Sequence, residues 1–208
     1  MTKPRPRSGP LLLALVALAG AVSSCTKTIR VDGLPDSVVE DDTRRLIQAQ
    51  SLAARAAREK DPAQAKRLYT QAVGTYRQLP AAWNNLGVLL MKDDQYLQAA
   101  EAFASAADLA PNDPRPYYNI GLLWDSRGYL RDARRFYIRA LERDGSYLPA
   151  LRGAIRADTL LNEPNDRTLG WLERSLMLEA DPEWQEWMRL QKVRIESQPL
   201  FRTREQPE

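Results

Sequence analysis

The feature that most constrains this chain is a self-similarity with a period of about 34 residues, a spacing that marks repeat architectures. It runs without a gap from about residue 46 to residue 181. Equivalent pairs include Trp83 and Tyr117, Gly87 and Gly121, Ala99 and Ala133, Phe103 and Tyr137, and Ala106 and Ala140. In such arrays each unit buries its apolar face only by packing on the next unit. The repeat therefore predicts an elongated array.

Each unit has the pattern of two short helices. Pro80 and Pro114 suit a first helical turn, where the missing N–H has no helical partner to lose, and Asp113 stands where a side chain can cap the helix. Apolar residues return at three- and four-residue spacing over residues 83–91 and 97–109, and the polar run 92–95 interrupts them. We therefore predict an all-α protein built from antiparallel helix pairs.

The unit resembles the tetratricopeptide repeat. The motif residues are Trp83, Leu86, Gly87, Ala99, Phe103, Ala106 and Pro111, followed one period later by Tyr117, Gly121, Trp124, Ala133, Tyr137 and Ala140. The resemblance implies an α-solenoid of about four helix pairs over residues 37–197. It also gives Asn85 the role of an amide that bridges helices.

The resemblance weakens toward the end of the array. The last unit carries Ile155, Arg167 and Arg174 where small residues are expected. Its helices must pack differently, or the register shifts there by one or two residues. Residues 182–197 have aromatic and apolar residues on one face and resemble the helix that caps such arrays, whereas residues 198–208 are expected to be a disordered tail.

The segment 1–24 has the pattern of a secretory signal. Lys3, Arg5 and Arg7 precede an apolar run at residues 11–22, which is shorter than the ~20 residues that span a bilayer. The sequence that follows, Val22-Ser23-Ser24-Cys25, resembles the bacterial lipobox. That resemblance implies cleavage before Cys25 and acylation, including palmitate, of this residue.

The residue after the cysteine is Thr26, and in lipoproteins an aspartate at this position retains the protein in the inner membrane. The resemblance therefore favours an outer-membrane lipid anchor on the periplasmic side, with the inner membrane or cell surface as alternatives. Residues 25–36 are expected to be a lipidated tether.

Composition argues against several classes of function. The chain has no histidine and one cysteine, so His-based catalysis, intramolecular disulfides and thiolate zinc sites are excluded. Without a phosphate-binding glycine loop or a nucleophile elbow, we expect no enzyme, no cofactor and no metal. The signal holds three of the 30 Lys and Arg residues and no acid; 27 then balance the 27 Asp and Glu, which argues against nucleic acid.

Function is then expected at the surface. In the family the first helix of each pair lines a concave groove that receives a partner segment. Carried over to this chain, the groove residues are Arg58, Asn84, Val88, Met91, Lys92, Arg115, Tyr118, Leu122, Asp125, Arg152 and Arg156. Five are basic and one is acidic, so the face is either an ordinary solvated surface or a groove for an acidic segment. Arg152 and Arg156 are expected to be exposed, so that their reversal to Glu would abolish partner binding with almost no loss of thermal stability.

The two resemblances together imply a lipid-anchored periplasmic adaptor that binds envelope proteins. Known tetratricopeptide lipoproteins assist assembly of envelope complexes, such as a pilus or secretin, the machinery of barrel insertion, or cell-wall enzymes, and a role of this kind is what we expect. The alternative is an accessory subunit that binds a cell-wall glycan or small ligand. Tyr118 is the clear aromatic candidate for such a contact.

Overall fold

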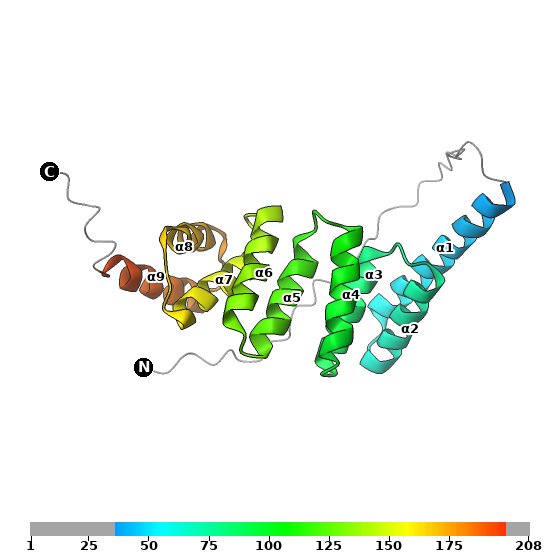
Figure 1. Ribbon diagram of the computed structural model, residues 1–208, viewed down its shortest axis with the longest axis horizontal. Coiled ribbons are helices and arrows are strands. Elements are labelled where there is room, and N and C mark those ends of the chain that lie inside the picture. Colours follow the sequence, from blue (N-terminus) through cyan, green and yellow to red (C-terminus); the bar gives the residue numbers. More distant parts are fainter. Residues whose placement is uncertain (1–35, 199–208) are drawn as a thin grey trace.

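The computed structural model describes residues 36–198, which form nine α-helices and no strand (Figure 1). The helices are α1 (Asp36–Arg58), α2 (Pro62–Thr75), α3 (Pro80–Lys92), α4 (Tyr96–Leu109), α5 (Pro114–Ser126), α6 (Leu130–Arg143), α7 (Leu148–Leu161), α8 (Asp166–Leu178) and α9 (Pro182–Glu196). Four pairs, α1–α2 to α7–α8, follow one another along the molecule, and α9 comes last. The predicted all-α solenoid is confirmed. The signal segment, Cys25 and residues 199–208 lie outside the described residues, and α1 begins at Asp36, the last residue of the expected tether.

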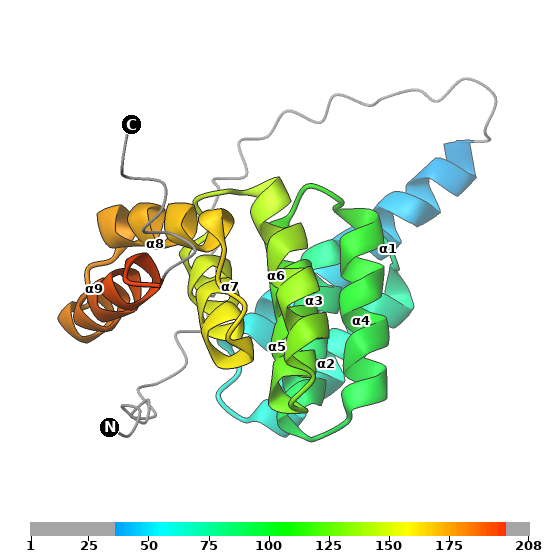
Figure 2. The same cartoon turned by 60° about the vertical axis from the view of Figure 1, so that its left-hand side comes forward.

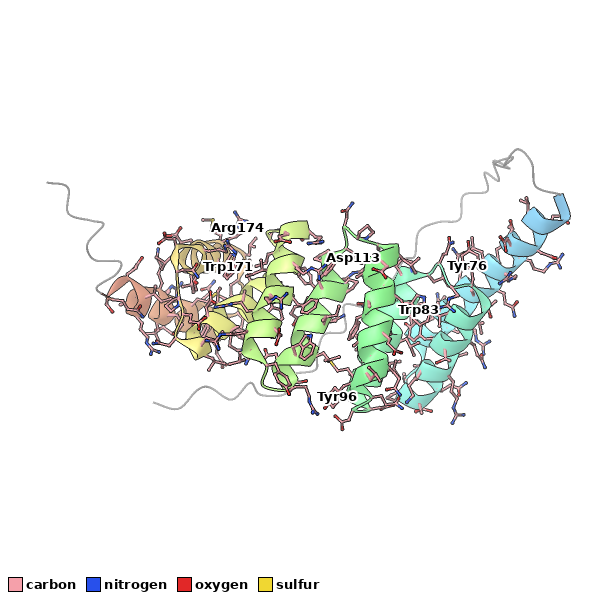
Figure 3. All side chains as sticks on the ribbon, viewed as in Figure 1. Tyr76, Trp83, Tyr96, Asp113, Trp171 and Arg174 are labelled. Carbon is pink, nitrogen blue, oxygen red and sulfur yellow. The ribbon has the colours of Figure 1, made fainter. Side chains whose placement is uncertain are left out.

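Three helices begin with the same N-terminal capping arrangement. Asp61, Asp113 and Asp181 each precede a proline, and each side chain accepts a hydrogen bond from the backbone N–H two residues on. The aspartate satisfies an N–H that has no partner within the helix, and the proline supplies a fixed φ at a position that needs no donor. Figure 3 shows Asp113 at the start of α5.

The turns inside the last three pairs share one backbone conformation. Asp94, Gly128 and Asn162, which follow one another at the period of the repeat, have φ of 58°, 82° and 55°. This left-handed region favours glycine and tolerates Asn and Asp better than other residues. The backbone conformation therefore recurs with the same period as the sequence, and it produces the same sharp turn between paired helices.

A ring on the second helix packs against a glycine on the first helix. Phe103 and Tyr137 are fully buried. A Cβ placed on Gly87 would lie 2.6 Å from the ring of Phe103, and one on Gly121 would lie 2.6 Å from the ring of Tyr137. Only glycine permits this approach, so the periodic Gly and aromatic positions are two halves of one contact.

Two neighbouring asparagines tie helices together. The Asn85 amide donates to the Tyr69 hydroxyl at 3.0 Å and bridges α3 to α2, the role that the resemblance gave it. Asn84, which was expected to line the groove, is buried and accepts a hydrogen bond at 2.8 Å from Asn119 on α5. A buried amide needs such a partner, so Asn84 joins two repeats through its carbonyl oxygen, and little of its side chain is open to a ligand.

The last pair departs from this pattern. Ile155 takes the position of Gly87 and Gly121 and is fully buried against Leu172 and Met188. Its branched side chain occupies the space that a ring fills in the earlier units. In Figures 1 and 2, α8 does not run alongside α4 and α6 but turns across the array. The altered packing expected of the last unit is therefore real.

The helix α9 closes the array. Met188 and Ile195 are buried against Ile155 and Leu172, with Trp184 beside them. None of the helices in residues 36–198 is long and apolar enough to cross a membrane.

Candidate partner-binding surface

The first helices of the pairs share one face of the molecule. Contacts join α3 to α5 and α5 to α7 across neighbouring pairs. We call the sides of α1, α3, α5 and α7 that point away from their own second helices the first-helix surface. The groove residues carried over from the family all lie on these four helices, and their surroundings differ from one end of the surface to the other.

On α5, Arg115 is held by the carboxylate that caps its own helix. Its Nε donates to Asp113 Oδ1 at 2.9 Å and its Nη2 donates to Oδ2 at 2.6 Å. Burial acts to raise the pKa of Asp113, but the hydrogen bonds and charge of Arg115 outweigh it and lower the pKa. The charge of Arg115 is therefore largely neutralised within the protein.

On α7, Arg156 forms an ion pair with Asp125 of α5. The Tyr137 hydroxyl donates to the same carboxylate at 2.9 Å. The Asp125 side chain is 8% exposed and the Arg156 side chain 28% exposed. The prediction of a freely exposed Arg156 is wrong, because this side chain balances a buried charge between two repeats.

Arg152 repeats this arrangement one turn earlier in α7. Its Nε donates at 2.6 Å to Oε2 of Glu179, whose side chain is 2% exposed. Its guanidinium carbon also lies 4.8 Å from the ring centroid of Trp184 on α9. Arg152, expected to be exposed, instead fastens α7 to α9 and the turn before it.

The ring of Tyr118 is enclosed by two other tyrosines. Its centroid lies 5.8 Å from that of Tyr137 and 5.6 Å, edge to face, from that of Tyr147. Burial raises the pKa of Tyr118, against the opposing effect of Arg152 and Arg156. The sequence placed these residues of α5 and α7 on one surface. They do lie close together there, but their main contacts are within the protein, which leaves little of them for a partner.

The apolar groove residues also contribute to packing. Val88 and Met91 contact the cluster around Phe103, and Leu122 contacts the cluster around Tyr137; all three are half-buried. They form part of the contact between repeats, so only part of each side chain is open to a partner.

The part of the first-helix surface on α1 and α3 is more open. Arg58 and Lys92, which are equivalent positions in neighbouring repeats, are exposed and form no ion pair within residues 36–198. Ile47 is 62% exposed, and Ala54 and Ala81 are exposed as well. Sequence reasoning missed these three residues, although Ala81 is the register equivalent of both Ile47 and Arg115.

Exposed basic charge gathers on a helix that the sequence did not single out. On α6, a second helix, Arg131 and Arg135 have side chains 71% and 79% exposed, and Arg139 is exposed too. They recur every four residues, a spacing that puts them on one side of the helix. On α5 and α7 the arginines do lie on first helices as expected, but Asp113, Asp125 and Glu179 neutralise them, so they form no free basic surface.

The described residues contain no cluster of three or more Cys, Asp or Glu side chains that could hold a metal ion. The chemistry of this surface is that of association: apolar side chains, amides and ion pairs.

In comparison with known proteins, one unit of the array matches a repeat family. Residues 80–113, which form α3 and α4, match the family model described as tetratricopeptide repeat. Over 120 residues the chain is 28% identical to a UDP-N-acetylglucosamine–peptide N-acetylglucosaminyltransferase of Giardia intestinalis. That match takes in 58% of this chain but only 8% of the enzyme's length.

Solved structures show the same fold. The crystal structure of MamA is 19% identical with a TM-score of 0.56, over 68% of this chain and 82% of that chain. The first TPR of Spaghetti (RPAP3) bound to an HSP90 peptide is 17% identical with a TM-score of 0.52, over 56% of this chain and 94% of that chain. Both likenesses concern the arrangement of helix pairs.

Proposed function

We propose that this chain, with its array of tetratricopeptide-type helix pairs, is an adaptor that binds a segment of a partner protein on the α1 and α3 part of the first-helix surface. The observation that carries the proposal is the contrast along this surface. On α5 and α7 the arginines are committed to Asp113, Asp125 and Glu179. On α1 and α3, Ile47, Ala54 and Ala81 are exposed, and Arg58 and Lys92 form no ion pair within the described residues.

The small side chains at the open end suit close approach of a partner backbone. Ala54 and Ala81 leave room above the helices, and Ile47 offers apolar area that is otherwise left in water. The first TPR of Spaghetti (RPAP3), whose structure contains a bound HSP90 peptide, supports the idea that such an array can hold a peptide.

The proposed partner segment carries acidic residues, in contact with Arg58 and Lys92. Both cations also lie at the C-terminal ends of their helices, where they stabilise the helix dipole whether or not a partner is present. Two exposed charges orient the partner segment on the surface rather than add much affinity, and binding should weaken as salt screens them.

The place of action that we propose is the bacterial envelope. Cys25 would carry the lipid, and the helical array would face the periplasm as an adaptor in an envelope complex. Support comes from the positive, apolar and small-residue segments that precede Cys25 in sequence. Against the alternative of a glycan-binding subunit, the Tyr118 ring is already packed between two tyrosines and offers little face for a sugar.

Photo-crosslinking tests the proposed surface. A photoreactive residue at Ala54 or Ala81 should yield a defined adduct with an envelope protein in cells. The same residue at Ala104, which is exposed on the second helix α4, is the matched control and should yield none. Adducts at Ala104 and not at Ala54 or Ala81 would place the partner on the other side and refute the proposal.

A separate experiment tests the anchor. Cys25→Ser should abolish incorporation of labelled palmitate and release the protein from the membrane fraction, or leave it uncleaved. A serine variant that is still acylated and membrane-bound would refute the lipoprotein assignment without affecting the proposed binding surface.

A further inference from the structure

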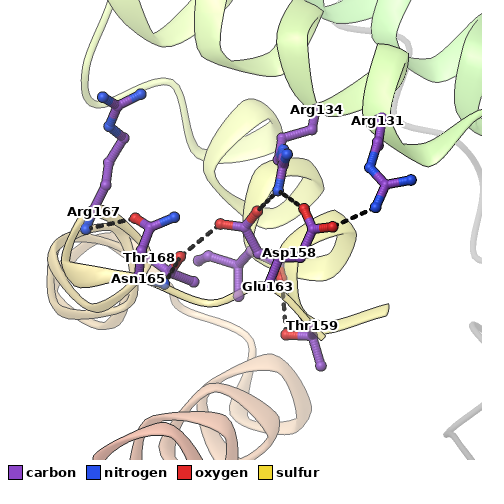
Figure 4. A network of polar contacts seen from close by, with 9 residues as sticks. Arg131, Arg134, Asp158, Thr159, Glu163, Asn165, Arg167 and Thr168 are labelled. Atoms are coloured by element: carbon purple, nitrogen blue, oxygen red, sulfur yellow. Dashed lines mark hydrogen bonds and ion pairs between the residues drawn. The ribbon is translucent and has the colours of Figure 1, made fainter. Parts of the chain in front are cut away.

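A pocket of about 400 Å³ lies between α6 and the start of α8, away from the first-helix surface. Its lining residues are Arg134, Ile138, Asp158, Glu163, Asn165, Arg167 and Trp171. The volume falls within the range of small-ligand sites. Figure 4 shows the polar side of this pocket, where α6, the end of α7 and the turn before α8 meet.

The pocket exists because the last repeat breaks the pattern at three equivalent positions. Ile155 replaces glycine, so Trp171, the equivalent of Tyr137, cannot pack into that space and remains half-buried at the pocket wall. Asp158 stands where the earlier repeats have Leu90 and Trp124, both of which pack in apolar clusters. The space between helices that apolar side chains fill in the earlier repeats is therefore left as a pocket in the last repeat.

The carboxylates of the pocket are already engaged. Asp158, 1% exposed, accepts from Arg134 Nη1 at 2.9 Å and from the Thr168 hydroxyl at 2.6 Å. Glu163 accepts from the same Nη1 at 3.0 Å and from Arg131 at 2.5 Å. These bonds fix both acids and place Arg134 between them (Figure 4).

The groups left to meet a ligand are hydrogen-bond donors. Arg134 uses Nη1 for both carboxylates, and its Nε and Nη2 form no hydrogen bond within the described part of the chain. Asn165 accepts the Arg167 backbone N–H through Oδ1, which leaves its amide NH₂ as a donor. The exposed Arg167 side chain adds a second guanidinium, on the far side of Asn165 from Arg134 (Figure 4).

The geometry points to a binding site for a carboxylate that is attached to an apolar or ring-shaped body. Guanidinium groups bind carboxylates in a bidentate manner, and Trp171 and Ile138 provide the apolar wall beside them. The carboxylate has two sources, the carboxyl terminus of a polypeptide or a free small acid, which share this chemistry.

Two matched pairs of probes test the site with the ¹⁵N-labelled full-length protein at constant ionic strength. The first is N-acetylphenylalanine and its amide, which mimic a chain terminus; the second is benzoate and benzamide. The readout is the indole N–H signal of Trp171, assigned by its loss in Trp171→Phe. Each acid should bind more tightly than its amide by about tenfold or more, the factor expected from one hydrogen bond to a charged group.

The variants separate this pocket from general attraction to a basic surface. Arg167→Gln should weaken the preference for the acids, since Arg134 is then the one guanidinium left among the residues that line the pocket, and because Arg167 is exposed the fold should persist. Arg189→Gln on α9 makes the same change of charge outside the pocket and should leave the preference intact. Tighter binding of N-acetylphenylalanine would support a chain terminus, and tighter binding of benzoate a free acid. Equal binding of acids and amides, or equal effects of the two variants, would overturn the inference.

Discussion

The ring of Tyr137 lies between Gly121 and Gly153, so close to both that a Cβ on either glycine would fall within 2.9 Å of a ring carbon. One aromatic side chain on α6 thus contacts its own partner helix α5 and the first helix of the next pair. The stability of the array depends on contacts of this kind, which join paired helices and successive repeats at once.

Gly121→Leu should therefore unfold more easily than the parent. The added side chain overlaps a buried ring and the carbonyl of Ala133, 3.2 Å from the Cβ position, and such overpacking costs about 1–3 kcal/mol or more. Chemical denaturation measures the loss. Gly74→Ala is the control: apart from the adjacent backbone of its own helix, nothing lies within 4 Å of a Cβ placed there, and alanine should stabilise the helix by about 0.5–1 kcal/mol. Equal stability of Gly121→Leu and the parent would contradict the glycine–ring contact.

Gly128 should respond to substitution for a different reason. No atom lies within 4 Å of a Cβ there, but its φ is 82°. Gly128→Val should cost about 1–2 kcal/mol, because a branched side chain is strained in the left-handed region. Gly128→Asn should cost less, since Asn162 already adopts φ of 55° at the equivalent position. Thermal melts that rank valine at or above asparagine would show that this conformation imposes no constraint.

Replacing Arg156 should lower stability even without a ligand. Arg156→Gln leaves the 8% exposed Asp125 carboxylate without its cation, at a cost of about 3 kcal/mol, the low end for a broken buried pair. The expectation that Arg152 and Arg156 could be reversed to Glu with almost no loss of stability is therefore wrong. Arg189→Gln, which breaks a pair with both side chains at least 59% exposed, should cost about 0–1 kcal/mol. Denaturation curves of the two glutamine variants measure the difference, and equal losses would contradict a buried pair at Asp125.

Tyr147 should titrate late and link stability to alkaline pH. Burial, and then the neighbouring Tyr118, raise the pKa of Tyr147 from 10.0 to about 12. Because the folded value exceeds the unfolded one, its contribution to stability is full below pH 10 and is lost as the pH rises toward 12. In an ultraviolet difference titration Tyr147→Phe should lack a transition near pH 12. An unchanged curve would mean that another tyrosine accounts for that transition.

The first helices show how far sequence reasoning reached at the surface. The register correctly placed Arg115, Tyr118, Asp125, Arg152 and Arg156 on two neighbouring first helices. It did not reveal that Arg156 pairs with Asp125 and Arg152 with Glu179. Glu179 is not a first-helix residue, and its position beside Arg152 depends on the orientation of α8 and α9. The sequence did indicate altered packing in the last repeat, because Ile155 stands where a small residue is expected. It did not indicate that a pocket would form beside Trp171.

The sequence by itself determined the helix pairs, their number and their order. These follow from local causes: the apolar spacing, the Asp-Pro helix starts, and a period that brings Gly87 and Phe103 to the same relation as Gly121 and Tyr137. Only the tertiary structure decided which charges are free. The charge state of a surface depends on partners that meet in space, such as Arg156 with Asp125, and the orientation of α8 depends on the volume of Ile155, which no periodic pattern specifies.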